Sequence, residues 1–184
     1  MLKYPPLKPQ KIPESLIYKR LLTEPVRRRF SYRYNVMFST KTGKKQAIMS
    51  YVPTFSFPKG KPVKSLYISY LYSFESGHGY GTKMLNFARN CSIKEGCGGR
   101  FHLDASISLL PQKVPHIFYR KYGMTTYNKK LDKKIDKFIK QGKTATSSDF
   151  SDIAMYYNPQ ENNKKSQLRK LLNKLKIWFG ANKS

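Results

Sequence analysis

The sequence is poor in cysteine and contains no long apolar run. Cys91 and Cys97 are its two cysteines, and two cysteines in a chain of this size do not form a disulfide framework. Neither has a metal-binding spacing with histidine, so no metal is expected. No apolar run approaches the roughly 18 residues of a membrane span, and residues 1–6 lack the apolar segment of a signal peptide. These absences predict a reduced, cytoplasmic protein.

Acidic residues are also scarce. The chain has 10 Asp and Glu against 36 Lys and Arg, which gives a formal net charge of +26. A surface with this charge attracts polyanions. RNA, DNA and an anionic membrane are therefore candidate partners. The alternative interpretation is a general enrichment in lysine that serves no particular ligand.

The chain is long enough for one domain with a proper core, because it has 184 residues. Its aromatic content of 14% favours a β-rich core with tyrosines at the edges. We expect an extended arm over 1–13, one α/β domain over 14–160 and a basic amphipathic helix over 161–184.

Hydrophobic periodicity and turn residues predict the order of the elements. A helix is expected over 14–22, because Leu16, Ile17 and Leu21 share a helical face after Pro13. Residues 30–38 alternate cleanly, which predicts a half-buried strand. The further expected elements are a strand over 47–52, a loop over 53–64, a central strand over 65–74, a helix to about residue 94, a strand over 100–107, a short helix from Pro115, a strand from Met124, a helix over 128–141 and a strand over 153–158.

A glycine-rich turn lies between the central strand and the helix that follows it. Its sequence is Ser76-Gly77-His78-Gly79-Tyr80-Gly81. Glycines at a helix N-terminus let a phosphate approach the unpaired backbone N–H groups. The glycine spacing differs from the dinucleotide-binding fingerprint, and no Gly-Lys-Ser/Thr closes the turn as in a Walker loop. The alternative is a tight strand-to-helix turn without a ligand.

Two motifs together resemble those of the GNAT N-acetyltransferase superfamily. The turn at 76–81 resembles its acyl-CoA signature, Arg/Gln-x-x-Gly-x-Gly/Ala. Phe118-Tyr119-Arg120-Lys121-Tyr122-Gly123-Met124 resembles its second hallmark, Phe-Tyr-x-x-x-Gly-Phe. The sequence departs from the pattern at Ser76, where the family has Arg or Gln, and at Gln112, where it usually has Asn. The resemblance implies a mixed, mostly antiparallel sheet flanked by helices, and acetyl-CoA as cosubstrate.

The resemblance also implies roles for particular residues. Backbone groups of the central strand would hold the pantetheine and polarise the thioester carbonyl, and the glycine turn would hold the pyrophosphate. The implied cofactor-binding residues are Ser69, Tyr70, Leu71, Ser76, Gly77, His78, Gly79, Tyr80, Gly81, Thr82 and Gln112. Tyr119 is the candidate general acid, because a phenol with a pKa near 10 is protonated at neutral pH.

The general base is less closely defined. His102 is the first candidate, because an imidazole pKa near 6.5 suits the task; Glu75, Asp104 and a chain of waters are the alternatives. His102, Asp104 and Ser106 also invite a hydrolase interpretation. Three side chains on one face of one strand point outward in parallel, however, whereas a catalytic triad needs them to converge.

The predicted function is transfer of an acetyl group from acetyl-CoA to a primary amine carried by an RNA, such as an aminoacyl-tRNA, or by a protein. The alternative is a non-catalytic module of the same fold that binds RNA or an anionic membrane. A basic amphipathic helix over 164–179 has three candidate partners: the protein's own sheet, an anionic membrane or a partner protein. We expect it to dock on the sheet. Its apolar stripe is Leu168, Leu171, Leu172, Leu175, Trp178 and Phe179.

Overall fold

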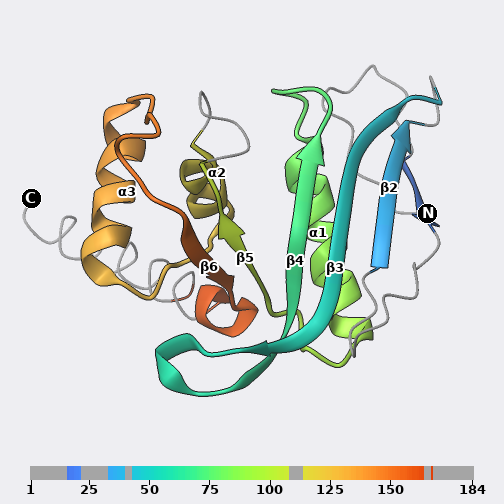
Figure 1. Cartoon of the computed structure of the whole chain (residues 1–184), viewed down its shortest axis with the longest axis horizontal. Helices are drawn as coiled ribbons and strands as arrows, with labels where there is room; N and C mark the ends of the chain where they lie inside the picture. Colours follow the sequence, from blue (N-terminus) through green and yellow to red (C-terminus); the bar gives the residue numbers. More distant parts are fainter. Residues whose placement is uncertain (1–15, 22–32, 40–42, 108–113, 164–166, 168–184) are drawn as a thin grey trace, which may run out of the picture.

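The computed structural model describes residues 16–21, 33–39, 43–107, 114–163 and 167 (Figure 1). These residues form a mixed α/β fold. Its elements in chain order are β1 (Leu16–Leu21), β2 (Arg33–Ser39), β3 (Lys45–Ser56), the 3-10 turn η1 (Pro58–Gly60), β4 (Val63–Ser73), α1 (Tyr80–Lys94), β5 (Phe101–Ala105), α2 (Pro115–Tyr122), α3 (Lys129–Gln141) and β6 (Ile153–Tyr157).

The strands form one sheet in the order β1-β2-β3-β4-β5-β6. Neighbouring strands are antiparallel except β4 and β5, which are parallel and are joined through α1. Figure 1 shows α1 behind β3 and β4. The prediction of a mostly antiparallel mixed sheet with flanking helices is therefore confirmed.

The predicted N-terminal helix over 14–22 is wrong. Residues 16–21 form the edge strand β1, in register with β2 from Leu16 opposite Ser39 to Leu21 opposite Tyr34. The apolar spacing fitted a helix, but pairing with an available strand edge satisfies the same backbone groups. The half-buried pattern expected for β2 is also wrong, because the consecutive side chains of Asn35, Val36 and Met37 are all buried.

The hairpin of β3 and β4 is longer than expected. Half of the predicted loop over 53–64 belongs to the two strands, and η1 forms its tip. Pro53 lies inside β3, opposite Leu66. Within the described residues β3 pairs with β2 only as far as Tyr51, so in this part of the chain the missing N–H of Pro53 costs no ladder bond on the β2 side.

The core lies between the helices and one face of the sheet. Its fully buried side chains include Met49 and Tyr51 from β3, Leu66 from β4 and Met84 and Leu85 from α1. The predicted α1 helix is confirmed, and Gly96 follows it with a φ of 70°. This left-handed conformation is typical of the position after a helix.

The third helix is also confirmed. The side chain of Asn128 caps α3 by accepting hydrogen bonds from two backbone N–H groups, and Gly142 ends the helix with a φ of 61°. The strand predicted from Met124 is reduced to a single bridge between Thr125 and Tyr156.

Some expectations fall on parts of the chain outside the described residues. They include the arm over 1–13, Gln112 and nearly all of the helix over 164–179; the described residues 159–163 and 167 are helical. Cys91 and Cys97 are free thiols. In the described part of the chain, no helix is long and apolar enough to cross a membrane.

Candidate functional site

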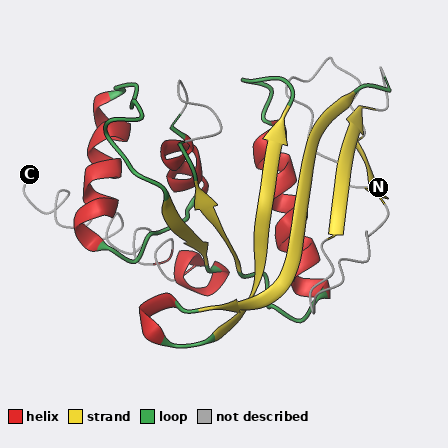
Figure 2. Cartoon of the chain, in the orientation of Figure 1, coloured by secondary structure: helices red, strands yellow, loops and turns green. Residues whose placement is uncertain are grey.

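Strands β4 and β5 are paired over a very short length. Leu66 lies opposite Phe101 and Tyr67 opposite His102, and the two strands then separate. The Leu66 N–H donates to the Arg100 carbonyl at 3.1 Å, at the closed end of the pair. Figure 2 shows the two arrows diverging towards their C-terminal ends. Beyond Tyr67, the edge of β4 that faces β5 is paired with no strand of the described chain.

A β-bulge lies in β4 where the strands begin to diverge. Ser50 of β3 pairs with Tyr70 and the next residue, Tyr51, pairs with Ile68, so Ser69 is an extra residue. Its hydroxyl is hydrogen-bonded to that of Ser50. A bulge bends a strand and frees backbone groups from the ladder. Ser69, Tyr70 and Leu71, the three sequence-predicted pantetheine residues, are therefore the bulge and the two residues after it.

The second half of β4 and the residue after it expose aromatic side chains on the face opposite α1. Tyr70, Tyr72 and Phe74 are 40%, 36% and 49% exposed. Their rings form a row, with centroids 6.4 Å apart for the first pair and 5.2 Å apart for the second. The strand is central in the sheet, as predicted, but this part of it is open because β5 has moved away.

The glycine turn lies at the open end of the strand pair. Residues 75–79 are exposed, and Gly77 and Gly79 have φ values of 81° and 73°. Gly79 is the N-cap of α1, so no side chain at this position caps the first N–H groups of the helix. A Cβ built on either glycine would meet nothing within 4 Å. The left-handed backbone explains why glycine is needed at these two positions. The open space around them leaves the turn accessible to a large anion.

The other residues of the turn play different parts. Gly81 packs closely against α2, since a Cβ there would lie 3.0 Å from the Phe118 ring. The Ser76 carbonyl accepts a hydrogen bond from His78 Nδ1 at 2.8 Å, and the His78 ring stacks on Tyr80. The ammonium of Lys83, in the first turns of α1, lies 5.2 Å from the centroid of the Tyr80 ring. It adds a positive charge to this end of the helix, whereas Thr82 is exposed beside it.

Tyr119 lies in the core on α2. Its side chain is 8% exposed, and its ring packs beside Phe118 with centroids 5.2 Å apart. Burial raises the pKa of Tyr119 to about 12. Its hydroxyl therefore stays protonated at neutral pH. Donating that proton costs more free energy than it would for an exposed phenol.

His102 lies in a polar cluster at the closed end of the pair. Its Nδ1 is hydrogen-bonded to Ser65 Oγ at 3.0 Å, and its ring stacks on Tyr156. Beside it, the Tyr67 hydroxyl donates to Asp104 Oδ2 at 2.9 Å. Burial lowers the pKa of His102, and the Asp104 charge opposes this in part. The imidazole is therefore neutral at pH 7, as a general base must be.

The two candidate catalytic residues are on opposite faces of β5. Tyr119 belongs to the core cluster with Phe101, Leu103 and Ala105, whereas His102 alternates with those residues and points to the other face. A group inserted between β4 and β5 would be reached from both sides. Ser106 donates to Asp152 and not to His102, so the serine–histidine–aspartate interpretation has no geometric support.

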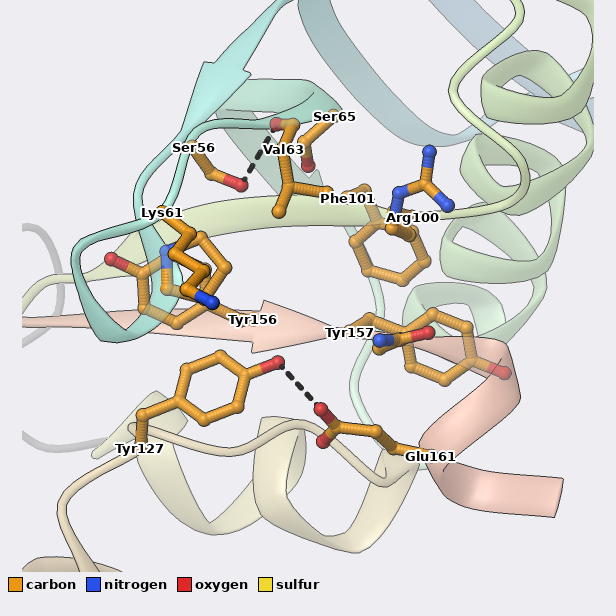
Figure 3. A pocket seen from close by; sticks show the side chains of 12 residues that line it. Ser56, Lys61, Val63, Ser65, Arg100, Phe101, Tyr127, Tyr156, Tyr157 and Glu161 are labelled. Carbon is orange, nitrogen blue, oxygen red and sulfur yellow. Dashed lines mark hydrogen bonds between the residues drawn. The ribbon is translucent and has the colours of Figure 1, made fainter. Parts of the chain in front are cut away.

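A cavity of about 290 Å³ lies beyond the closed end of the strand pair, between the β3–β4 hairpin and β6 (Figure 3). Sequence reasoning did not identify it. The charged residues and tyrosines of its lining are Lys61, Arg100, Tyr127, Tyr156, Tyr157 and Glu161. Its wall includes Ser65, the hydrogen-bond partner of His102.

Comparisons with known proteins identify no family for this chain. No protein-family model matches the sequence, and no curated protein matches it. A solved structure described as "Crystal structure of bacterial toxin" matches weakly, with 11% sequence identity and a TM-score of 0.46. The match covers 74% of this chain and 72% of that one.

Proposed function

We propose that the protein is an acetyl-CoA-dependent N-acetyltransferase of the GNAT type. The observation that carries the proposal is the separation of the parallel strands β4 and β5 after two residue pairs, with the β4 bulge and the glycine turn at the open end. This arrangement combines backbone groups free to bind an extended chain with a helix N-terminus suited to a pyrophosphate. The motifs at 76–81 and 118–124 support the same assignment.

The cosubstrate would bind along the open edge of β4. Backbone amides from Gly77 to Thr82 would donate to the pyrophosphate, and Lys83 would add a positive charge. The pantetheine would take the place of a neighbouring strand beside Ser69, Tyr70 and Leu71, where no strand in the described part of the chain pairs with β4 on the β5 side. The thioester would then reach the vertex where β4 and β5 meet. Ser76 cannot supply the long side chain usual at its position, so backbone and Lys83 must hold the phosphates.

The chemistry is acyl transfer to nitrogen. The neutral amine attacks the thioester carbon, a C–N bond forms, and the C–S bond breaks. The amine nitrogen gives one proton to His102, and the departing thiolate takes one from Tyr119, which leaves an amide and the free thiol of CoA. For His102 to act as base, its Nε2 must be unprotonated, which requires Nδ1–H to donate to Ser65 Oγ. Proton exchange with water restores both side chains.

The acceptor class follows from charge rather than from a motif. With a net charge of +26, the protein would draw in a polyanion, which favours an amine carried by RNA over a free small amine at long range. An aminoacyl-tRNA-like acceptor and a protein acceptor both remain within the proposal.

A non-catalytic module of the same fold is the second candidate. The burial that raises the Tyr119 pKa to about 12 favours it, because a weaker acid is a poorer proton donor. The two functions differ in turnover: a module would bind RNA or anionic vesicles without consuming acetyl-CoA.

The deciding experiment is a calorimetric titration of the full chain with acetyl-CoA, followed by release of the free CoA thiol in an acceptor screen. Saturable binding and thiol release with an amine acceptor are the expected results. A folded protein that shows no heat of binding at millimolar acetyl-CoA would overturn the enzyme assignment. Binding without turnover on any amine would favour the module.

A further inference from the structure

The cavity beyond the closed end of the β4–β5 pair holds a carboxylate among tyrosine rings. Glu161 lies just after β6, where the chain is helical, and its Oε1 accepts a hydrogen bond from the Tyr127 hydroxyl at 3.4 Å. Among the described lysines and arginines none forms an ion pair with Glu161. Within the described residues, no Lys or Arg side chain therefore neutralises this carboxylate, although basic residues outnumber acidic ones 36 to 10 in the chain.

The tyrosines that surround the carboxylate are held in place. The rings of Tyr127 and Tyr156 have centroids 5.2 Å apart, and Tyr157 stacks on Phe101 at 4.7 Å. Tyr127 has a φ of 58°, which is a strained conformation for a bulky side chain. Hydrogen bonds from Thr126 to Asp132 fix the adjoining backbone. In this conformation the Tyr127 ring lies beside Tyr156 and its hydroxyl donates to Glu161.

The two basic residues of the cavity wall are Arg100 and Lys61, and neither forms an ion pair with Glu161. Arg100 donates from Nε to the Lys64 carbonyl at 3.0 Å, and its guanidinium lies against Gly98. Figure 3 shows the Arg100 guanidinium turned away from Tyr127 and Glu161. Lys61 is exposed and follows η1 at the tip of the hairpin. Its ammonium can therefore leave the cavity without breaking a buried contact.

We propose that this cavity binds an organic cation, held by the Glu161 carboxylate and the faces of the tyrosine rings. A carboxylate and electron-rich ring faces both attract an ammonium ion, and the attraction is strongest where water is excluded. The basic surface opposes cations at long range, but charges more than about 8 Å away are screened at physiological salt. Contacts within the cavity therefore decide whether the ligand that binds there is positively or negatively charged.

The cavity also adjoins the candidate base. Ser65 lines it and is hydrogen-bonded to His102, and Tyr156 lines it and stacks on the His102 ring. A ligand in the cavity thus extends towards the vertex of the two strands. This part of the inference rests on the proposed acetyl transfer.

The cation held by Glu161 is not the amine that reacts. A carboxylate beside an amine raises the amine pKa and keeps it protonated, whereas the attacking nitrogen must be neutral. Whether RNA or a protein carries the acceptor, its amine-bearing part therefore has two separated basic groups, joined by an aliphatic linker. One group stays charged at Glu161, and the other reaches His102 and is acetylated.

Tetramethylammonium tests the cavity without any acetyl transfer, because it is a fixed cation that cannot be acetylated. Binding to the full chain would be followed through the tyrosine ring resonances in the absence of acetyl-CoA. Glu161→Gln should weaken binding about tenfold, the scale of a partly desolvated cation contact. Lys61→Met should strengthen it, because a repelling charge is removed. Glu75→Gln, at the open end, is the matched control and should change nothing.

The opposite pattern would overturn the proposal. Inorganic phosphate binding that is lost in Lys61→Met would show that the cavity takes anions. Equal tetramethylammonium affinity in the wild type and Glu161→Gln would show that the carboxylate plays no part. Lys61→Met keeps the test valid if Glu161→Gln fails to fold.

Turnover tests the two-group acceptor. The wild type should show a lower KM for 1,4-diaminobutane than for butylamine, and Glu161→Gln should remove the difference. Equal KM values in the wild type would overturn the two-group acceptor. Acetyl-CoA binding without tetramethylammonium binding would overturn the cavity proposal alone. Tetramethylammonium binding without acetyl-CoA binding would overturn the proposed enzyme and leave the cation site.

Discussion

The two ends of the β4–β5 pair offer different kinds of surface from the same two strands. At the open end, the accessible groups are backbone: the β4 edge after the bulge and the N-terminus of α1. At the closed end, the strands are in register and the accessible groups are side chains, namely the Glu161 carboxylate and tyrosine rings. As proposed, the open end would bind an extended anion and the closed end a compact cation.

This difference follows from how the backbone is satisfied. Where strands pair, their N–H and C=O groups are hydrogen-bonded to each other, so only side chains can recognise a ligand. Where strands separate, the backbone itself becomes a binding element, and the side chains beside it can vary. Binding at the open end should therefore be lost when the backbone conformation or the charge of the glycine turn is changed. Binding at the closed end should be lost when single side chains are changed.

The largest effect is expected at the glycine turn. Gly79→Asp should lower acetyl-CoA affinity by at least about 100-fold, because it places a carboxylate where phosphate would bind and strains a residue with a φ of 73°. Calorimetry measures the loss. Gly43→Asp is the matched control, since Gly43 has a φ of 67° and equally open surroundings. Equal losses in both variants would assign the effect to folding rather than to the turn.

A change in the core beside β5, at Tyr119 of α2, should act on turnover and not on binding. Tyr119→Phe should lower kcat by about 100-fold, a usual size for the loss of a general acid, and leave acetyl-CoA affinity almost unchanged. Steady-state kinetics and calorimetry together test this. Tyr122→Phe removes a hydroxyl from the same helix, where it donates to Asn86, and should keep kcat. If Tyr119→Phe retains full activity, the residue serves packing only.

The smallest effect concerns the pH profile at the closed end. Burial places the His102 pKa below its usual value of 6.5, so kcat/KM should fall only as the pH drops below that value and the base becomes protonated. Asp104→Asn removes the charge that raises this pKa, so the acid limb should move to still lower pH. Asp152→Asn should leave the limb in place. A limb unmoved by Asp104→Asn would exclude His102 as the base.

Local signals predicted the helices α1 and α3. The helix from Tyr80 to Lys94 has an apolar stripe and a glycine after it, and α3 has an asparagine cap and a terminal glycine, so both are readable without tertiary context. Residues 16–21 are not, since their spacing fits a helix and only the edge of β2 makes them a strand. The same is true of Pro53, whose strand conformation depends on where β2 stops.

The cavity was not predictable for similar reasons. Tyr127, Tyr156 and Glu161 come from separate segments that meet only in the fold. Tyr127 adopts a left-handed conformation that sequence patterns assign to glycine or asparagine. The one available signal was composition: with so few carboxylates, each one is worth locating. The sequence suggested His102 and Tyr119 as candidates, but their positions on opposite sides of β5 became apparent only from the fold.

The bulge at Ser69 makes β4 one residue longer than its partner requires. If that residue were removed, Ile68 and Tyr70 would become regular neighbours, and Leu66, Ile68 and Leu71 would still face α1 while Tyr67, Tyr70 and Tyr72 faced away. The side-chain pattern of the sheet is thus the same with and without Ser69. The alternation of buried and exposed side chains along β4 therefore does not require Ser69. The extra residue instead changes the path of the β4 backbone at the point where β5 turns away.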